Sequence, residues 1–98
     1  MIYHILLLEP KPETTSEELL AALERFKALK GQIPGLMEVQ AGINQHMMNQ
    51  GYTHGFLMTF ESEEALKAYL PHPAHKAISP ELRRLCSHLL NFDLLQEE

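Results

Sequence analysis

Five side chains of this sequence could together form an acid–base site, because they comprise four imidazoles and one phenol. They are His4, His54, Tyr69, His72 and His75. An imidazole titrates near about pH 6.5, so a partly buried histidine is a ready general base at neutral pH. A phenol donates a hydrogen bond to an oxyanion as it develops. Such a set is able to take a proton from a carbon beside a carbonyl and to stabilise the enolate that results.

Four apolar segments are predicted to be the strands that carry these groups. They cover residues 2–8, 36–43, 53–60 and 88–95. In the first segment one face carries Ile2, His4, Leu6 and Leu8, and the other carries Tyr3, Ile5 and Leu7. Apolar residues on both faces predict a central strand that is covered on both sides.

Helices are predicted between the strands. Thr15 and Glu18 have the spacing of a capping box, and Gly31 is placed to end the helix that they begin. A second helix is expected from Ser62 to about Leu70. Three prolines after residue 70 are expected to leave only short pieces, one of them helical near residues 80–86.

The element order β-α-β-β-α-β predicts an α+β, ferredoxin-like fold with an antiparallel sheet and both helices on one face. The first and third strands are expected to lie side by side and parallel, which would bring His4 and His54 to similar heights. Tyr69 would pack toward the sheet, with His72 and His75 just beyond it. Four or all five of these groups would then meet at one end of a mostly apolar cavity.

The other sheet face has no cover from its own chain in this topology. Residues such as Tyr3, Ile5 and Leu7 would form an exposed apolar patch, and large patches of this kind usually mark an interface. We therefore expect a homodimer that pairs through the sheet face, as in a dimeric α/β barrel.

Composition limits the other partners. The chain has 98 residues, 45% of them hydrophobic, and a formal net charge of −5, which fits one acidic domain over residues 1–98. Nucleic acid and anionic membranes favour basic surfaces, and Arg83-Arg84 is the only adjacent cationic pair. No apolar stretch approaches the roughly 20 residues that span a bilayer. A single cysteine, Cys86, excludes an internal disulfide, so we expect a cytoplasmic protein with a solvated end at Gln96–Glu98.

Several motifs resemble the stress-responsive A/B barrel domain family, the dimeric α/β barrel proteins called Dabb. They are Gly51–Phe56, Thr59–Ser62, Tyr69–His75, the early His4 and the Ile33–Gly35 turn, so the resemblance runs from Met1 to about Asp93. It implies a ferredoxin-like fold that pairs into a barrel. A plant branch of the family resembles polyketide cyclases that use aldol chemistry without a cofactor. The working residues of that branch would be matched here by His4, His54, Tyr69 and His75.

The resulting hypothesis is a small-molecule-binding protein, in particular a cofactor-independent lyase or cyclase for an apolar or aromatic carbonyl substrate. His75 would be the base and Tyr69 the oxyanion donor or orienter, with His4, His54 and His72 as binding groups. The alternative is a non-catalytic, stress-associated binding or interaction protein, in which the histidines and the tyrosine only hold the structure together.

Two further alternatives rank lower. A metal site would use His72 and His75, three residues apart, with His4 and His54 completing the set. Related dimeric barrels also include cofactor-free monooxygenases and haem-degrading enzymes, but nothing in the sequence specifies haem ligation or a quinone-forming substrate.

Overall fold

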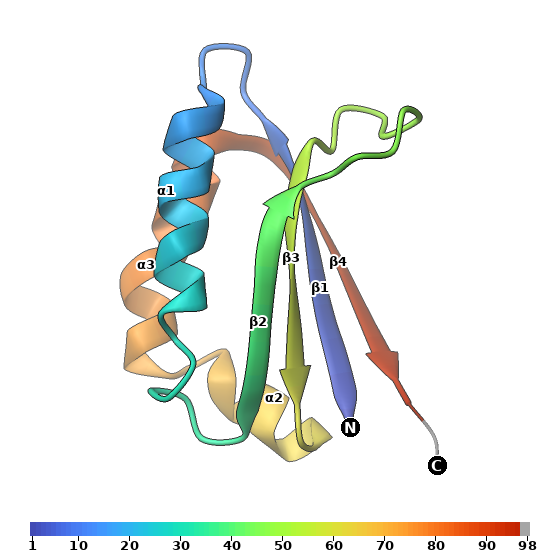
Figure 1. Cartoon of the computed structure of the whole chain (residues 1–98). Coiled ribbons are helices and arrows are strands. Elements are labelled where there is room, and N and C mark those ends of the chain that lie inside the picture. Colours follow the sequence, from blue (N-terminus) through green and yellow to red (C-terminus); the bar gives the residue numbers. More distant parts are fainter. Residues whose placement is uncertain (97–98) are drawn as a thin grey trace.

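A computed structural model describes residues 1–96; of the end that we expected to be solvated, Gln96–Glu98, the last two residues lie outside the described residues. The elements in chain order are β1 (Ile2–Pro10), α1 (Ser16–Lys27), β2 (Leu36–Ile43), β3 (His54–Phe60), α2 (Glu63–Tyr69), α3 (Pro73–Leu85) and β4 (Cys86–Leu95). The strands form one sheet in the order β2-β3-β1-β4, and α1 and α3 both lie against the same face (Figure 1). This is the predicted ferredoxin-like α+β fold.

The pairing of the two central strands differs from the prediction. β1 and β3 are adjacent but antiparallel, with Leu8 opposite His54 and His4 opposite Met58. The expectation of parallel strands is wrong because the β1-α1-β2 crossover makes β2 parallel to β1, and the β2–β3 hairpin then reverses the chain. His4 therefore lies level with Met58, four residues from His54 along β3, or about 14 Å at strand spacing.

The first helix begins as predicted. Thr15 accepts the backbone N–H of Glu18 at 3.1 Å, and the Glu18 carboxylate accepts the backbone N–H of Thr15 at 3.0 Å. The helix ends at Lys27, before Gly31, because the backbone N–H of Leu29 turns to the carbonyl of Phe26, three residues back. The N-terminal capping box is thus confirmed, and the C-terminal boundary is corrected.

The third helix, α3, is continuous over 13 residues rather than broken into short pieces. Pro73 stands in its first turn, where a missing N–H costs nothing. Pro80 lies inside the helix and cannot donate to the carbonyl of Lys76, but both residues are on the exposed side of the helix. The continuous helix places His75 in its first turn, a few residues after the end of α2.

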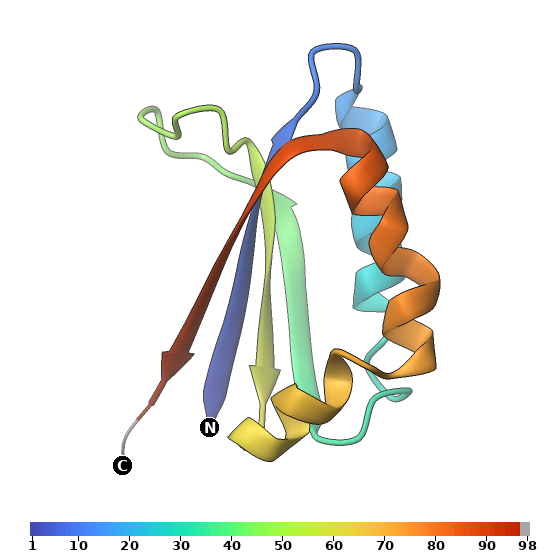
Figure 2. The same ribbon diagram turned by 180° about the vertical axis from the view of Figure 1, so that it is seen from behind.

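The core fills the space between the sheet and the helices. Its most buried large side chains are Leu8, Leu19, Leu23, Phe26, Met58, Phe60, Tyr69 and Leu85. The alternation predicted for β3 is confirmed, since His54, Phe56, Met58 and Phe60 are all buried. Viewed from behind, α3 runs along the helical layer and the chain crosses from its end into β4 at the sheet edge (Figure 2).

The opposite face of the sheet is left open. On β4 the side chains of Leu90, Phe92 and Leu94 are 47%, 54% and 47% exposed. They pair in register with Leu7, Ile5 and Tyr3 of β1, so the two strands form one apolar surface. No helix within residues 1–96 is long and apolar enough to cross a membrane.

Candidate active site

A cavity of about 380 Å³ lies between the helices and the helix-facing side of β1, β3 and β4. Its apolar wall consists of Leu6, Phe26, Phe56, Leu66, Leu70, Leu82 and Leu89. Its polar groups are His4, Tyr69, His75, Ser79, Arg83, Asn91 and Asp93. A mostly apolar cavity with a few convergent polar groups is the usual form of a small-molecule site.

The rings of Tyr69 and His75 lie next to each other in this cavity. Tyr69 is the last residue of α2 and His75 lies in the first turn of α3, and their ring centroids are 4.4 Å apart. The Nδ1–H of His75 donates to the carbonyl oxygen of Leu70 at 2.9 Å, since a carbonyl can only accept. The neutral ring therefore carries its lone pair on Nε2, the form that a general base requires.

Burial keeps His75 in that neutral form. Desolvation lowers the pKa of its imidazole below the usual value, and the charges of His4 and Arg83 act in the same direction. The hydrogen bond to Leu70 opposes this shift but is the smaller effect. At neutral pH the ring is thus available as a base.

The hydroxyl of Tyr69 is buried and has no hydrogen-bond partner within the described residues. The ring itself is held by Phe60, with centroids 5.3 Å apart, and by His4 at 6.0 Å. Burial strongly raises the pKa of the Tyr69 phenol, so it keeps its proton. An unpaired buried donor is costly, and a bound acceptor would relieve that cost.

His4 is 6% exposed and is paired with a carboxylate that sequence reasoning missed. Its Nδ1–H donates to Oδ1 of Asp93 at 2.6 Å, across the β1–β4 pair. The alternation of side chains along β4 could have revealed this partner, because it places Asn91 and Asp93 on the side of the strand that faces the helices. Polar residues on the side of a strand that faces the core need a partner or a ligand.

His54 lies away from the cavity, at the other end of β3. Both of its ring nitrogens are engaged, Nε2 with the Ser16 hydroxyl at 3.1 Å and Nδ1 with the Thr53 hydroxyl at 2.8 Å. Burial lowers its pKa. The antiparallel register thus corrects the expected meeting of His54 with His4.

His72 is also outside the cavity lining. It caps α3, where its Nδ1 accepts the backbone N–H of Ala74 at 3.0 Å. Of the five side chains expected to converge, the structure brings together three: His4, Tyr69 and His75.

The metal alternative gains no support from this geometry. In that alternative His72 and His75 would share an ion and His4 and His54 could complete the set, but His4 and His54 lie at opposite ends of the central strand pair. Across residues 1–96, no three His, Cys, Asp or Glu side chains group closely enough to hold a metal ion.

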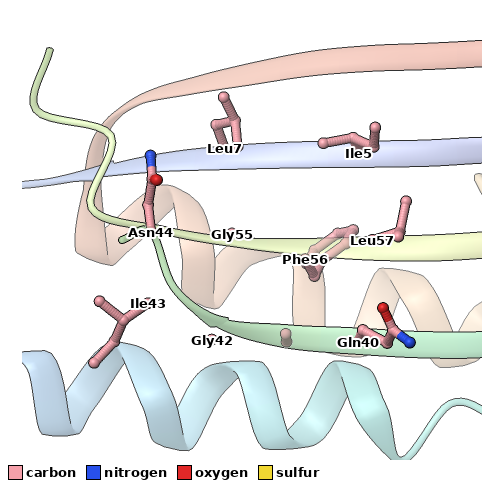
Figure 3. Close-up of a pocket in the computed structure, with 10 residues that line it drawn as sticks. Ile5, Leu7, Gln40, Gly42, Ile43, Asn44, Gly55, Phe56 and Leu57 are labelled. Carbon is pink, nitrogen blue, oxygen red and sulfur yellow. The ribbon is translucent and has the colours of Figure 1, made fainter. Parts of the chain in front are cut away.

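A second hollow, of about 400 Å³, lies on the sheet (Figure 3). Its lining includes Ile5, Leu7 and Leu57, with Gly42 and Gly55 paired across β2 and β3. A Cβ atom at Gly55 would come within 2.7 Å of the Leu6 carbonyl oxygen, whereas Gly42 faces open space. None of its lining side chains titrates near neutral pH, so the hollow suits packing rather than proton transfer.

The chain is similar to known proteins in both sequence and fold. Residues 2–95 match the Dabb family model, the stress responsive A/B barrel domain. The chain belongs to this family. As a Dabb protein it is 32% identical to olivetolic acid cyclase of Cannabis sativa over 94 residues, 94% of this chain and 93% of that one.

Two solved structures show the same fold. A protein of Jannaschia sp. CCS1, described as a dimeric ferredoxin-like protein of unknown function, is 32% identical, with a TM-score of 0.86 over 97% of this chain and 98% of that one. At3g17210 of Arabidopsis thaliana is 28% identical, with a TM-score of 0.89 over 100% and 97% of the two chains. The predicted family and fold are thereby confirmed.

Proposed function

We propose that this Dabb protein binds a small carbonyl compound in the cavity between the helices and the sheet and acts on it as a cofactor-independent cyclase or lyase. The observation that carries the proposal is the buried hydroxyl of Tyr69, which has no hydrogen-bond partner within residues 1–96 and lies beside His75, whose neutral ring has its lone pair on Nε2. The two groups supply a hydrogen-bond donor and a base within one apolar cavity.

The reaction would begin with proton transfer. Nε2 of His75 takes a proton from the carbon next to a carbonyl, and the C–H electrons move into the enolate. The oxygen of that enolate accepts the hydrogen bond of Tyr69. For ring closure, the enolate carbon attacks a second carbonyl of the same molecule, and a C–C bond forms. Protonated His75 then returns its proton to the new alkoxide; the lyase direction runs these steps in reverse.

His4 would support this chemistry without being the base. The Asp93 carboxylate holds the proton on Nδ1 of His4, which leaves Nε2 to contact the substrate. The 32% identity with a protein named as a cyclase, over nearly the full length of both chains, also supports the assignment.

Proton exchange tests the proposal directly. We expect the wild-type protein to accelerate deuterium uptake by ethyl 2-methylacetoacetate, a 3-oxo ester, as followed by NMR. His75→Ala should lower this rate by about a hundredfold, the low end of the general-base range. His46→Ala, in an exposed loop outside the cavity, is the matched control. Equal rates for His75→Ala and the wild type would remove His75 from the mechanism.

We also propose that two copies pair through the open sheet face. The apolar surface formed by β1 and β4 is uncovered in one chain, and exposed patches of this kind mark interfaces. The relative from Jannaschia, which is described as dimeric, supports this assembly. The hollow at Gly42 and Gly55 would receive side chains of the second copy (Figure 3).

A further inference from the structure

One face of α3 carries three polar residues toward the cavity. His75, Ser79 and Arg83 all line it, and they are spaced four residues apart, so they lie above one another along the helix. The face continues for two helical turns beyond the imidazole that we assign as the base. The cavity therefore has a second polar end, at Arg83.

Arg83 differs from the arginine beside it. Arg84 binds the carboxylate of Glu81 and does not line the cavity. Arg83 lines the cavity, takes part in no ion pair within residues 1–96, and is the only Lys or Arg in the cavity lining. The chain has 13 acidic and 8 basic side chains, and an arginine that lines a cavity without an ion-pair partner among residues 1–96 is available for an anion.

We propose that Arg83 anchors the carboxylate of an amphipathic oxo acid, whose apolar chain fills the cavity and whose reacting carbon lies at His75. The inference rests on the function proposed above and specifies its substrate class. A planar guanidinium binds a carboxylate through two parallel hydrogen bonds, which fixes orientation as well as position.

The other charged groups of the cavity agree with this orientation. Among the described residues Asp93, held by His4, is the only carboxylate of the lining, and it would repel an anion from the β4 side. The carboxylate of the ligand is thus directed toward α3. The apolar chain of the ligand would pack against the leucines and phenylalanines of the apolar wall.

The helix also sets the length of the ligand. Eight residues of helix rise about 12 Å between His75 and Arg83. Helical side chains lean toward the helix N-terminus, so the guanidinium is carried part of the way back toward His75. The carboxylate should therefore be separated from the reacting carbon by several bonds, rather than being attached to it.

Calorimetric titration with ligands of similar alkyl chain length tests the anchor. The probes are octanoate, octanamide and octyl phosphate, each with the wild-type protein and with Arg83→Gln, Arg83→Lys and Arg84→Gln. We expect wild type and Arg84→Gln to bind octanoate about tenfold more tightly than octanamide. Arg83→Gln should bind both equally, and Arg83→Lys should retain part of the preference. Unchanged melting temperatures verify that each variant is folded.

The outcomes separate this inference from the proposed function. Equal binding of octanoate and octanamide by the wild type would overturn the anchor and leave the cavity as a binding site. An equal loss of preference in Arg84→Gln would also overturn it, since only general charge would then matter. Tighter binding of octyl phosphate than of octanoate would assign Arg83 to phosphate and overturn the carboxylate. If no probe binds the wild type, both the anchor and the binding site fail.

Discussion

His4 and Asp93 join the central strand β1 to the edge strand β4 through one hydrogen bond of 2.6 Å between Nδ1 and Oδ1. The imidazole is buried, whereas the carboxylate is 46% exposed, so the pair reaches from the cavity wall to solvent. Because the Asp93 carboxylate can only accept, this hydrogen bond holds the proton of the His4 ring on Nδ1.

Asp93→Asn is expected to weaken that selection. Loss of one charge-assisted hydrogen bond of about 1.5 kcal/mol corresponds to a roughly tenfold fall in the rate of proton exchange. The ¹⁵N shifts of the His4 ring should also show a mixture of tautomers. Glu81→Gln, which removes a carboxylate outside the cavity, is the control. A single Nδ1–H tautomer in Asp93→Asn would contradict the assigned role.

Tyr69→Phe should slow proton exchange without lowering the stability of the fold. The hydroxyl has no partner to lose within the described residues, so the free energy of unfolding should stay within about 1 kcal/mol of wild type or rise. Proton exchange should nevertheless slow, because the enolate loses its donor. Denaturant unfolding and the NMR assay on the same samples check both parts. A strongly destabilised variant would mean that the hydroxyl has a structural partner after all.

The proton-exchange rate should depend on pH in a way that identifies the base. Burial lowers the pKa of His75 below its ordinary value of about 6.5. The ring should therefore stay neutral, and the protein active, from pH 8 down to about pH 6.5. The rate should fall only at more acidic pH, as the ring becomes protonated. A rate that already declines between pH 8 and pH 7 would contradict His75 as the base.

Acid should also destabilise the fold, through His54 and His75. Burial lowers the pKa of both in the folded chain, while both titrate near about 6.5 when unfolded. Between those values the unfolded state binds more protons, so the free energy of unfolding falls as the pH drops below about 6.5. Melting temperatures from pH 7 to pH 5 should show this decline. His54→Gln should flatten it, whereas His46→Gln, at an exposed position, should not.

Phe92→Asp should dissociate the proposed dimer. The change places a charge at the centre of the apolar surface of β1 and β4, where desolvating it on association would be costly. Sedimentation should show a dimer for wild type and a monomer for the variant. Met47→Asp, at a side chain that is 96% exposed in the loop between β2 and β3, should remain dimeric. A wild-type monomer at micromolar concentration would overturn the dimer.

Local patterns predicted much of this fold. The alternation of β3, the limits of β2 and the Thr15–Glu18 capping box depend on residues close in sequence, and all three are confirmed. The continuity of α3 could not be predicted in the same way. An exposed Pro80 is tolerated only because the opposite side of the helix is packed against the core, and that is a tertiary effect.

The candidate site was only partly predictable, for a related reason. Tyr69 and His75 are six residues apart, so their proximity follows from one helix ending and the next beginning. Whether His4 meets His54 or Asp93 depends on strand direction and register. A single residue type such as histidine carries no information about either, and here Asp93 is the residue that faces His4.

The short connection between α2 and α3 has a consequence of its own. The proposed donor Tyr69, the proposed base His75 and the Leu70 carbonyl that orients the base all belong to one stretch of the chain, in which His75 is hydrogen-bonded back to Leu70. The relative position of Tyr69 and His75 is therefore fixed within one short continuous segment of the chain. Substitutions in the apolar wall of the cavity should change which molecule fits without moving Tyr69 relative to His75. An insertion at Pro71, in contrast, should separate these two side chains and abolish the proposed proton transfer.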